Sequence, residues 1–271
     1  MEFKFFCPLW GSSELDFPVF LEKVKSAGYD GVEMAMPLDN KKTKHRAAQI
    51  REFGLELIGQ HYETNDADPD QYKNSYRMRL ENLIEAEPLL INSQSSRDFF
   101  SFDDTKSILE VAFQLEKISG IKIVHETHRG KFSFAAHITK KYIEALPNLR
   151  LGLDLSHWCN VAESYLEDQP EAIELALSRT DHIHARIGYP EGPQIPDPRL
   201  PEWQEAVEHH LNWWEKVTNF HRQNNSNLLT ITSEFGPYPY MWHIPYTNQP
   251  ITSQWDVNVY MMQLLKKRLK T

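Results

Sequence analysis

The stretch IKIVHETH, residues 121–128, is the part of the sequence that decides the predicted fold. A short apolar run ends at Glu126, and glycines at positions 120 and 130 bound it, which is the pattern of a buried strand. The Glu126 carboxylate then stands at the carboxyl end of that strand. A single acid at this position is equally well explained as a solvent-exposed loop residue. Whether Glu126 has a functional role therefore depends on which residues end the other strands.

Short β-rich runs alternate with longer amphipathic segments along the whole chain. Strands are predicted at residues 3–9, 31–36, 55–62, 89–93, 121–126, 149–155, 182–187 and 228–233. Helices are predicted at residues 17–27, 41–53, 69–86, 103–119, 134–145, 170–179, 203–222 and 254–269. Eight such pairs without a break in composition predict one α/β domain over residues 1–271, a (β/α)8 TIM barrel. A doubly wound open sheet is the alternative, but the first strand lacks the glycine-rich turn typical of it.

Composition and charge fit one large domain and limit its partners. The 271 residues are 41% hydrophobic and carry a formal net charge of -9. An acidic surface repels polyanions, so neither nucleic acid nor an anionic membrane is expected as a partner. The basic run at residues 266–270 suits the end of the last helix, where positive charge complements the helix dipole.

The cellular location follows from what the sequence lacks. Cys7 and Cys159 are far apart and form no CxxC pair, which suits a reducing compartment. The first residues enter a strand pattern directly, without the features of a leader peptide, and no apolar stretch is long enough to span a membrane. We therefore expect a cytoplasmic protein.

Four consecutive predicted strands end in acidic residues or histidines, which are the side chains that bind divalent cations. They are Glu126, the segment DLSH at 154–157, the segment HIHAR at 182–186, and Glu234. In a barrel these strand ends lie side by side, so Glu126, Asp154, His184 and Glu234 are predicted to meet. Three carboxylates and an imidazole form a divalent-cation site, because acids crowded together without a cation repel each other.

Each of these residues also has a plain structural explanation. Asp154 suits a loop cap, His157 a packed loop histidine, and Glu234 an exposed turn. His182 and His184 face the same side of their strand, and one of them can be a satisfied core residue. The coincidence of four strand ends favours the functional interpretation over four separate structural ones.

The pattern Glu126, Asp154-x-x-His157, His184-x-Arg186 and Glu234 resembles the xylose isomerase-like TIM barrels. Within them it is most similar to the sugar isomerases and epimerases typified by D-tagatose 3-epimerase, over essentially the whole chain. The resemblance implies that the four strand-end residues hold one divalent cation and that His157 and Arg186 contact the substrate. The arginine of that family usually lies further beyond its histidine than Arg186 does.

Further residues are predicted to face the same rim. His61 at the end of the third strand and Glu33 in the second are pocket candidates, as is Trp10. Aromatic side chains at predicted loops suit a carbohydrate-like ligand, although core packing explains them equally well. These aromatics are Trp10, Tyr62, Trp158, Tyr189, Phe235, Tyr238, Tyr240 and Trp242.

The ligand set also limits the metal and the chemistry. Three oxygen donors and one imidazole suit Mn²⁺ first, then Mg²⁺ or Co²⁺, with Zn²⁺ still open. Such a site supports proton abstraction next to a carbonyl through a metal-stabilised enediolate, with Glu126 and Glu234 as the predicted catalytic acid and base. Isomerisation, epimerisation and dehydration of a keto-polyol all remain open. So does assembly into a homo-oligomer.

Two other classes of function compete with a sugar isomerase. Zinc AP endonucleases of the same superfamily share the framework but add an Asp-x-His after the seventh strand, where this chain has Asp197-Pro-Arg199. That difference and the acidic charge argue against DNA cleavage. A metal-binding protein without turnover is the other class, and the presence of both Glu126 and Glu234 argues against it.

Overall fold

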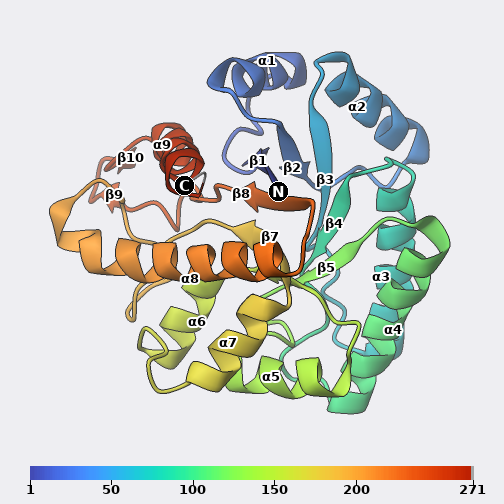
Figure 1. The fold of residues 1–271 in the computed structure, drawn as a ribbon. Helices are drawn as coiled ribbons and strands as arrows, with labels where there is room; N and C mark the ends of the chain where they lie inside the picture. The colour runs from blue at the N-terminus through green and yellow to red at the C-terminus, as the bar shows by residue number, and fades with distance from the viewer. Residues whose placement is uncertain (270–271) are drawn as a thin grey trace.

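The computed structural model describes residues 1–269, in which eight parallel strands close into a barrel surrounded by helices (Figure 1). The strands are β1 (Glu2–Pro8), β2 (Gly31–Met34), β3 (Glu56–His61), β4 (Leu90–Ser93), β5 (Ile123–Glu126), β6 (Leu151–Leu153), β7 (Thr180–His184) and β8 (Leu228–Thr232). Each strand pairs with the next, and β8 pairs with β1, which closes the ring. The predicted (β/α)8 TIM barrel is confirmed.

The surrounding helices lie close to their predicted positions. They are α1 (Phe17–Ala27), α2 (Asn40–Glu52), α3 (Pro69–Ile84), α4 (Phe102–Ser119), α5 (Ala136–Ala145), α7 (Pro170–Ser178), α8 (Gln204–Gln223) and α9 (Gln254–Arg268). The last turn of α9 carries the predicted basic residues Lys266, Lys267 and Arg268, whereas Lys270 lies outside the described residues. Among residues 1–269, no helix combines the length and apolar character needed to cross a membrane.

Local chemistry sets where the helices begin and end. Ser101 caps α4 by accepting a hydrogen bond from the Asp104 N–H at 3.1 Å, and the helix stops at Gly120 with a left-handed φ of 74°. Asp39 and Asp68 cap α2 and α3 in the same way as Ser101. Because a cap satisfies an otherwise unpaired N–H and glycine adopts positive φ without strain, these residues fix the turns around the barrel.

The inside of the barrel changes from apolar to polar along the strands. A separate buried cluster fills its amino-terminal end, made of Phe6, Ile58, Leu90 and Val124. Two residues further along, the same faces of β3, β4 and β5 carry Gln60, Asn92 and Glu126, all buried. On β6 the inward Gly152 leaves room for Asn92, since a Cβ there would collide with the Asn92 amide. The polar layer supports the residues at the carboxyl ends of the strands.

The first departure from the predicted elements follows β6. A strand is predicted to residue 155, but β6 ends at Leu153 and an additional helix, α6 (Leu155–Ala162), begins at once. Asp154 caps it by accepting a hydrogen bond from the Ser156 N–H at 2.9 Å. The apolar run LRLGLDL conceals this change, because Leu155 continues the strand pattern while belonging to a helix of only 8 residues.

The second departure is a small hairpin in the segment that joins β8 to α9. The strands β9 (His243–Ile244) and β10 (Gln249–Pro250) pair antiparallel there, next to α9 (Figure 1). Each has 2 residues, which is too short to produce a recognisable period in the sequence. A short 3₁₀ helix, Pro201–Trp203, likewise precedes α8.

Candidate metal centre and active site

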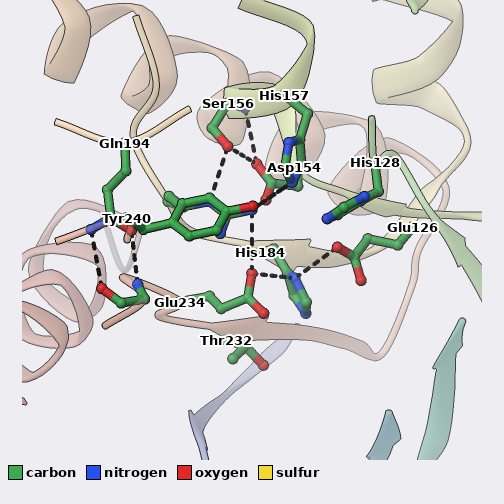
Figure 2. Close-up of polar contacts among 12 residues, drawn as sticks. Glu126, His128, Asp154, Ser156, His157, His184, Gln194, Thr232, Glu234 and Tyr240 are labelled. Atoms are coloured by element: carbon green, nitrogen blue, oxygen red, sulfur yellow. Dashed lines mark hydrogen bonds and ion pairs between the residues drawn. The ribbon is translucent and has the colours of Figure 1, made fainter. Parts of the chain in front are cut away.

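The four predicted ligands meet at the carboxyl ends of β5 to β8 (Figure 2). Glu126 ends β5, Asp154 follows β6, His184 ends β7 and Glu234 follows β8. One ligand atom from each lies within 4.8 Å of the others, and all four side chains are buried. His184 Nδ1 is 2.9 Å from Glu234 Oε2 and 3.7 Å from Glu126 Oε1. The barrel closure therefore gathers residues that lie far apart in the sequence.

The chemistry of this group fits a divalent cation. His184 Nδ1 and Glu234 Oε2 are buried 2.9 Å apart, but they are not aligned for a hydrogen bond, and neither has another such partner among the described residues. Unpartnered buried polar atoms are costly, and a cation coordinated between them would satisfy both. Three carboxylates and one imidazole are also the ligand types that Mn²⁺ and Mg²⁺ accept. The residues present fit a divalent metal ion, and their ligand types are compatible with more than one metal.

Glu33 lies beneath the metal centre and holds His184 from below. Its Oε1 is 2.8 Å from His184 Nε2, and its Oε2 is 3.1 Å from His182 Nε2. Thr232 and Asn92 also donate hydrogen bonds to this carboxylate. Because an ionised carboxylate only accepts, His184 Nε2 carries the proton, and its Nδ1 lone pair is left for a metal.

This position corrects the prediction that Glu33 faces the substrate pocket. Glu33 is 1% exposed and does not line the pocket. Burial opposes its charge, but His184 and His182 outweigh burial and hold the pKa of Glu33 well below its ordinary value. His182 is the satisfied core histidine of the pair, because its Nδ1 is also 2.8 Å from the Thr230 hydroxyl.

Burial and like charges shift the pKa values of the ligands in the metal-free chain. Burial raises the pKa of Glu126 to about 8, and Glu234, Asp154 and Glu33 add to the rise while His184 opposes it. Burial also raises the pKa of Asp154. For Glu234, burial is outweighed by His184 and Arg186, so its pKa is lowered. The opposite directions follow from position, because Glu234 lies beside the Arg186 guanidinium whereas Glu126 is surrounded by other carboxyls.

Arg186 is buried beside the candidate metal centre and donates hydrogen bonds to three residues of the segment that follows β6. It donates to Asp154, to the Ser156 hydroxyl at 3.1 Å and to His157 Nε2 at 2.7 Å. Because His157 Nε2 accepts this bond, a neutral His157 carries its proton on Nδ1, which is buried without a partner among the described residues. Arg186 lines the pocket, as predicted for a substrate contact, but His157 does not.

A pocket of about 420 Å³ opens above the metal ligands. Glu126, Glu234, Arg186 and Trp10 line it, in agreement with their predicted positions at the rim. Of the other aromatics singled out in the sequence, Tyr62 and Tyr240 also line the pocket, while Trp158 and Phe235 are fully buried in the core.

His61 lies outside the pocket, contrary to the prediction. Its Nδ1 is 2.9 Å from the Ser93 hydroxyl and its Nε2 is 2.7 Å from the Thr64 hydroxyl. The ring packs against Tyr76 and is fully buried. Because both nitrogens are occupied and burial lowers the pKa of His61 to about 3, this residue joins the ends of β3 and β4 and has no atom left for a substrate.

Four polar residues that line the pocket were not predicted from the sequence: Ser13, Gln60, Gln94 and His128. Gln60 donates to Glu234 Oε1 at 3.4 Å, and Gln94 donates to Glu126 Oε1 at 3.2 Å. His128 packs against His157 with 3.9 Å between the ring centres. Gln60 and Gln94 could have been identified by their positions at strand ends, because Gln60 precedes the last residue of β3 and Gln94 directly follows β4. An amide has no charge to draw attention in a sequence, yet these two orient both predicted catalytic carboxylates.

The backbone beyond Glu234 is held by amide side chains from two other elements. The Phe235 N–H donates to Asn258 Oδ1 at 2.7 Å, and Gln254 donates to the Phe235 carbonyl at 2.7 Å. The Gly236 N–H donates to Gln194 Oε1 at 2.8 Å, and Gln194 donates back to the Gly236 carbonyl (Figure 2). These bonds fix the segment that carries Glu234 into the pocket.

Asp197, where the zinc endonucleases place further ligands, is engaged away from the centre. Its carboxylate accepts from Arg199 Nε at 2.8 Å and from the Thr252 hydroxyl at 3.1 Å. Beside His157 the guanidinium of Arg186 already supplies a positive charge, which disfavours a second cation there. Glu126, His128 and His157 form a second group with ligand atoms within 4.8 Å of one another, but Asp197 is held by Arg199 and Thr252.

No protein-family model and no curated protein matches the sequence. Many solved structures share the fold. D-psicose 3-epimerase with D-tagatose from Clostridium cellulolyticum H10 matches at 18% identity with a TM-score of 0.63, over 98% of this chain and 99% of that one. Other sugar epimerases are among the similar structures.

Enzymes with other activities share the barrel as well. The probable 3-DHS dehydratase from Bacillus anthracis matches at 12% identity with a TM-score of 0.58, over 98% of this chain and 99% of that one. Endonuclease IV from Thermus thermophilus matches at 10% identity with a TM-score of 0.55, over 100% and 99% of the two chains. The chain thus shares its TIM-barrel fold with solved sugar epimerases and with a protein that contains a xylose isomerase domain, as the sequence resemblance predicts.

Proposed function

We propose that the protein is a divalent-metal-dependent sugar isomerase or epimerase that moves a proton next to a carbonyl group. The observation that carries the proposal is the pair Glu126 and Glu234. Both carboxylates line the pocket, both lie within 4.8 Å of His184 at the predicted metal centre, and each accepts a hydrogen bond from a glutamine amide. Two oriented carboxylates beside a metal site are what proton transfer at carbon requires.

The residues divide this work by position. A divalent cation, when bound by Glu126, Asp154, His184 and Glu234, supplies Lewis-acid stabilisation of an enediolate. One glutamate takes the proton from the carbon next to the carbonyl, and the other returns a proton to the neighbouring carbon or to the opposite face of the same carbon. Gln60 and Gln94 hold the two carboxylates in place, and Arg186 fixes Asp154. We favour Mn²⁺, since three oxygens and one imidazole suit it.

The substrate class is supported by the pocket and by the neighbours. Aromatic walls with a few fixed polar groups are typical of carbohydrate sites, and Trp10, Tyr62 and Tyr240 provide such walls here. A structural neighbour, D-psicose 3-epimerase, was crystallised with D-tagatose. Dehydration of a keto-polyol is the second candidate, because the same proton abstraction begins it and the probable 3-DHS dehydratase shares the fold.

The deciding experiment follows hydrogen exchange at carbon. The Mn²⁺-loaded protein is incubated in D₂O with ketoses, keto-inositols and hydroxypyruvate, and deuterium at carbon is measured by NMR. We expect exchange into at least one ketose, with an isomer or epimer as product. Formation of an α,β-unsaturated carbonyl instead would show dehydration. A complete absence of exchange and turnover across the panel would reject the proposal, and a Glu126→Gln/Glu234→Gln double variant gives the background.

A further inference from the structure

One wall of the pocket is polar and the other is apolar, and this difference limits which substrates can fit. The ends of β3, β4, β5, β7 and β8 contribute polar side chains, including the two proposed catalytic glutamates and Arg186. The end of β2 and the loops after β1 and β2 contribute a wall that is almost entirely apolar, with Ser13 as the polar exception, and its members are Leu9, Trp10, Met34 and Ala35. Because β1 and β2 are adjacent in the barrel, this apolar wall is continuous.

A single monosaccharide at the proposed metal ligands meets the polar wall of the pocket but gives the apolar wall no matching partner. Its hydroxyl groups point outward from nearly every carbon, so those directed at the apolar wall would lose water without gaining a partner. Each buried hydroxyl left unpaired is unfavourable for binding. The part of the substrate that lies on the apolar wall should therefore present carbon–hydrogen bonds or an aromatic face, as the flat side of a ring does.

Trp10 is exposed yet firmly held, which suits a stacking platform. Its side chain is 36% exposed at the pocket mouth. Gln254 donates to the Trp10 carbonyl at 2.9 Å, and Tyr240 packs edge-on against the indole with 5.2 Å between ring centres. Gly236 lies against the indole so closely that a Cβ would collide with it. A ring fixed in this way loses little conformational entropy when a ligand binds.

We propose that the substrate is a two-ring carbohydrate. The sugar with the carbonyl lies at the metal ligands, and a second ring, joined to it by a glycosidic bond, stacks on Trp10. This inference rests on the proposed function for the reacting end only. The pocket volume of about 420 Å³ falls within the roughly 300–1,000 Å³ typical of small-molecule sites. The second ring can be a sugar or an aryl group, because both present the flat face that the platform requires.

The test compares probes that differ by one ring. D-Fructose and lactulose, which carries a galactosyl ring on fructose, are compared for solvent deuterium exchange with the Mn²⁺-loaded protein. Methyl glucoside and p-nitrophenyl glucoside, which do not react, are compared for binding by calorimetry. We expect the two-ring member to be favoured by about tenfold or more in each pair. Lactulose and p-nitrophenyl glucoside distinguish a sugar ring from an aryl ring.

Variants connect the preference to the platform. Trp10→Ala should abolish the preference, and Trp10→Phe, which keeps an aromatic face, should retain part of it even if the alanine variant folds poorly. Tyr246→Ala is the control, since Tyr246 is a fully exposed aromatic that does not line the pocket. The proposal would be overturned if the one-ring and two-ring compounds of each pair exchanged or bound equally well. It would also be overturned if Trp10→Ala weakened the one-ring and two-ring compounds to the same extent. A Trp10-dependent binding preference without any exchange would reject the proposed function and leave the two-ring site standing.

Discussion

His184 joins two layers of the site at the scale of single residues. Its Nδ1 faces the carboxylates of the metal centre, while its Nε2 donates to Glu33 in the buried layer below. A carboxylate behind a ligating histidine fixes the orientation of the ring and makes it a stronger donor to the metal. We therefore propose that Glu33 positions His184 as a metal ligand.

Replacing Glu33 should weaken metal binding without removing a ligand. We expect Glu33→Gln to lower Mn²⁺ affinity by about 10–100-fold, the range found for such supporting groups. Titration calorimetry of the metal-free protein measures it directly. Asp197→Asn is a matched control, because Asp197 is also a buried carboxylate but belongs to a loop outside the centre. Unchanged affinity in Glu33→Gln would show that His184 is oriented by other contacts.

The two pocket glutamates should both be required for turnover. Glu126→Gln and Glu234→Gln keep the size of the side chain and remove its ability to carry a proton. Each variant should lose about 10²–10⁴-fold in kcat, as expected for a general acid or base. Melting curves and metal content establish that fold and centre persist. If either variant keeps near wild-type turnover with metal bound, that glutamate is only a ligand.

At the residue scale the sequence predicted which charged residues lie together, and it missed the amide side chains that contact them. Glu126, Asp154, His184 and Glu234 were identifiable because the carboxyl ends of parallel strands must converge. The role of Gln60 was not, because its value lies in one hydrogen bond to a residue 174 positions away. Whether such a side chain faces the pocket or the layer below depends on strand register, which the hydrophobic pattern leaves uncertain by a residue.

At the scale of elements, Asp181 at the start of β7 ties three neighbouring strands together. It accepts hydrogen bonds from Lys122, which precedes β5, and from Arg150, which precedes β6. Burial opposes its charge, but Arg150 and Lys122 outweigh burial, so the pKa of Asp181 is lowered. A lowered folded-state pKa stabilises the fold above the unfolded-state pKa, and this stability is lost as the pH falls through the folded-state value.

Asp181→Asn should therefore destabilise the protein in a pH-dependent way. We expect the free energy of unfolding at pH 7 to fall by about 1.5–3 kcal/mol, the usual contribution of hydrogen bonds to charged groups. The difference between wild type and variant should shrink below about pH 4, as the wild-type carboxyl becomes protonated. Urea unfolding at pH 7 and at lower pH measures both effects. A difference that is independent of pH would mean that packing, not charge, accounts for the loss.

Prediction of elements succeeded where the period was long and failed where it was short. The helix at residues 17–27 was placed at its observed bounds, Phe17–Ala27, because several turns of amphipathic pattern end at Gly28. Helix α6 was missed because a strand and a helix share one apolar run, with Asp154 between them serving as ligand and cap. The spacing of Asp154 in the sequence predicted its role as a ligand, but it did not reveal that the same residue also caps a helix.

For the whole molecule, metal should act as a stabilising ligand. Its predicted site is built from four strand ends that exist together only in the folded barrel. Metal at about 100 times its Kd adds about 2.7 kcal/mol to the free energy of unfolding. For a chain of this size this corresponds to a rise in Tm of roughly 5–10 °C. Scanning calorimetry with Mn²⁺ and with a chelator measures the shift. An Asp154→Asn/His184→Ala variant should show none, and full metal retention in it would reject the assignment.

The acidic surface leads to a second whole-molecule prediction. With a net charge of -9 and Asp197 engaged by Arg199, the protein should neither retard nor cut abasic duplex DNA at physiological salt. A gel-shift and cleavage assay with Mn²⁺, Mg²⁺ and Zn²⁺ tests both activities. Cleavage that requires Glu126 would instead favour the endonuclease interpretation.

The separation of the pocket into a polar half and an apolar half bears on how the proposed enzyme can be redesigned. The proposed metal ligands come from the ends of β5 to β8, and the apolar wall comes from the end of β2 and the loops after β1 and β2. Libraries confined to those two loops would vary what the pocket accepts while leaving the proton-transfer groups in place. New specificities should therefore be reachable by steps that each keep a working catalyst, which is the condition for improvement by successive rounds of selection.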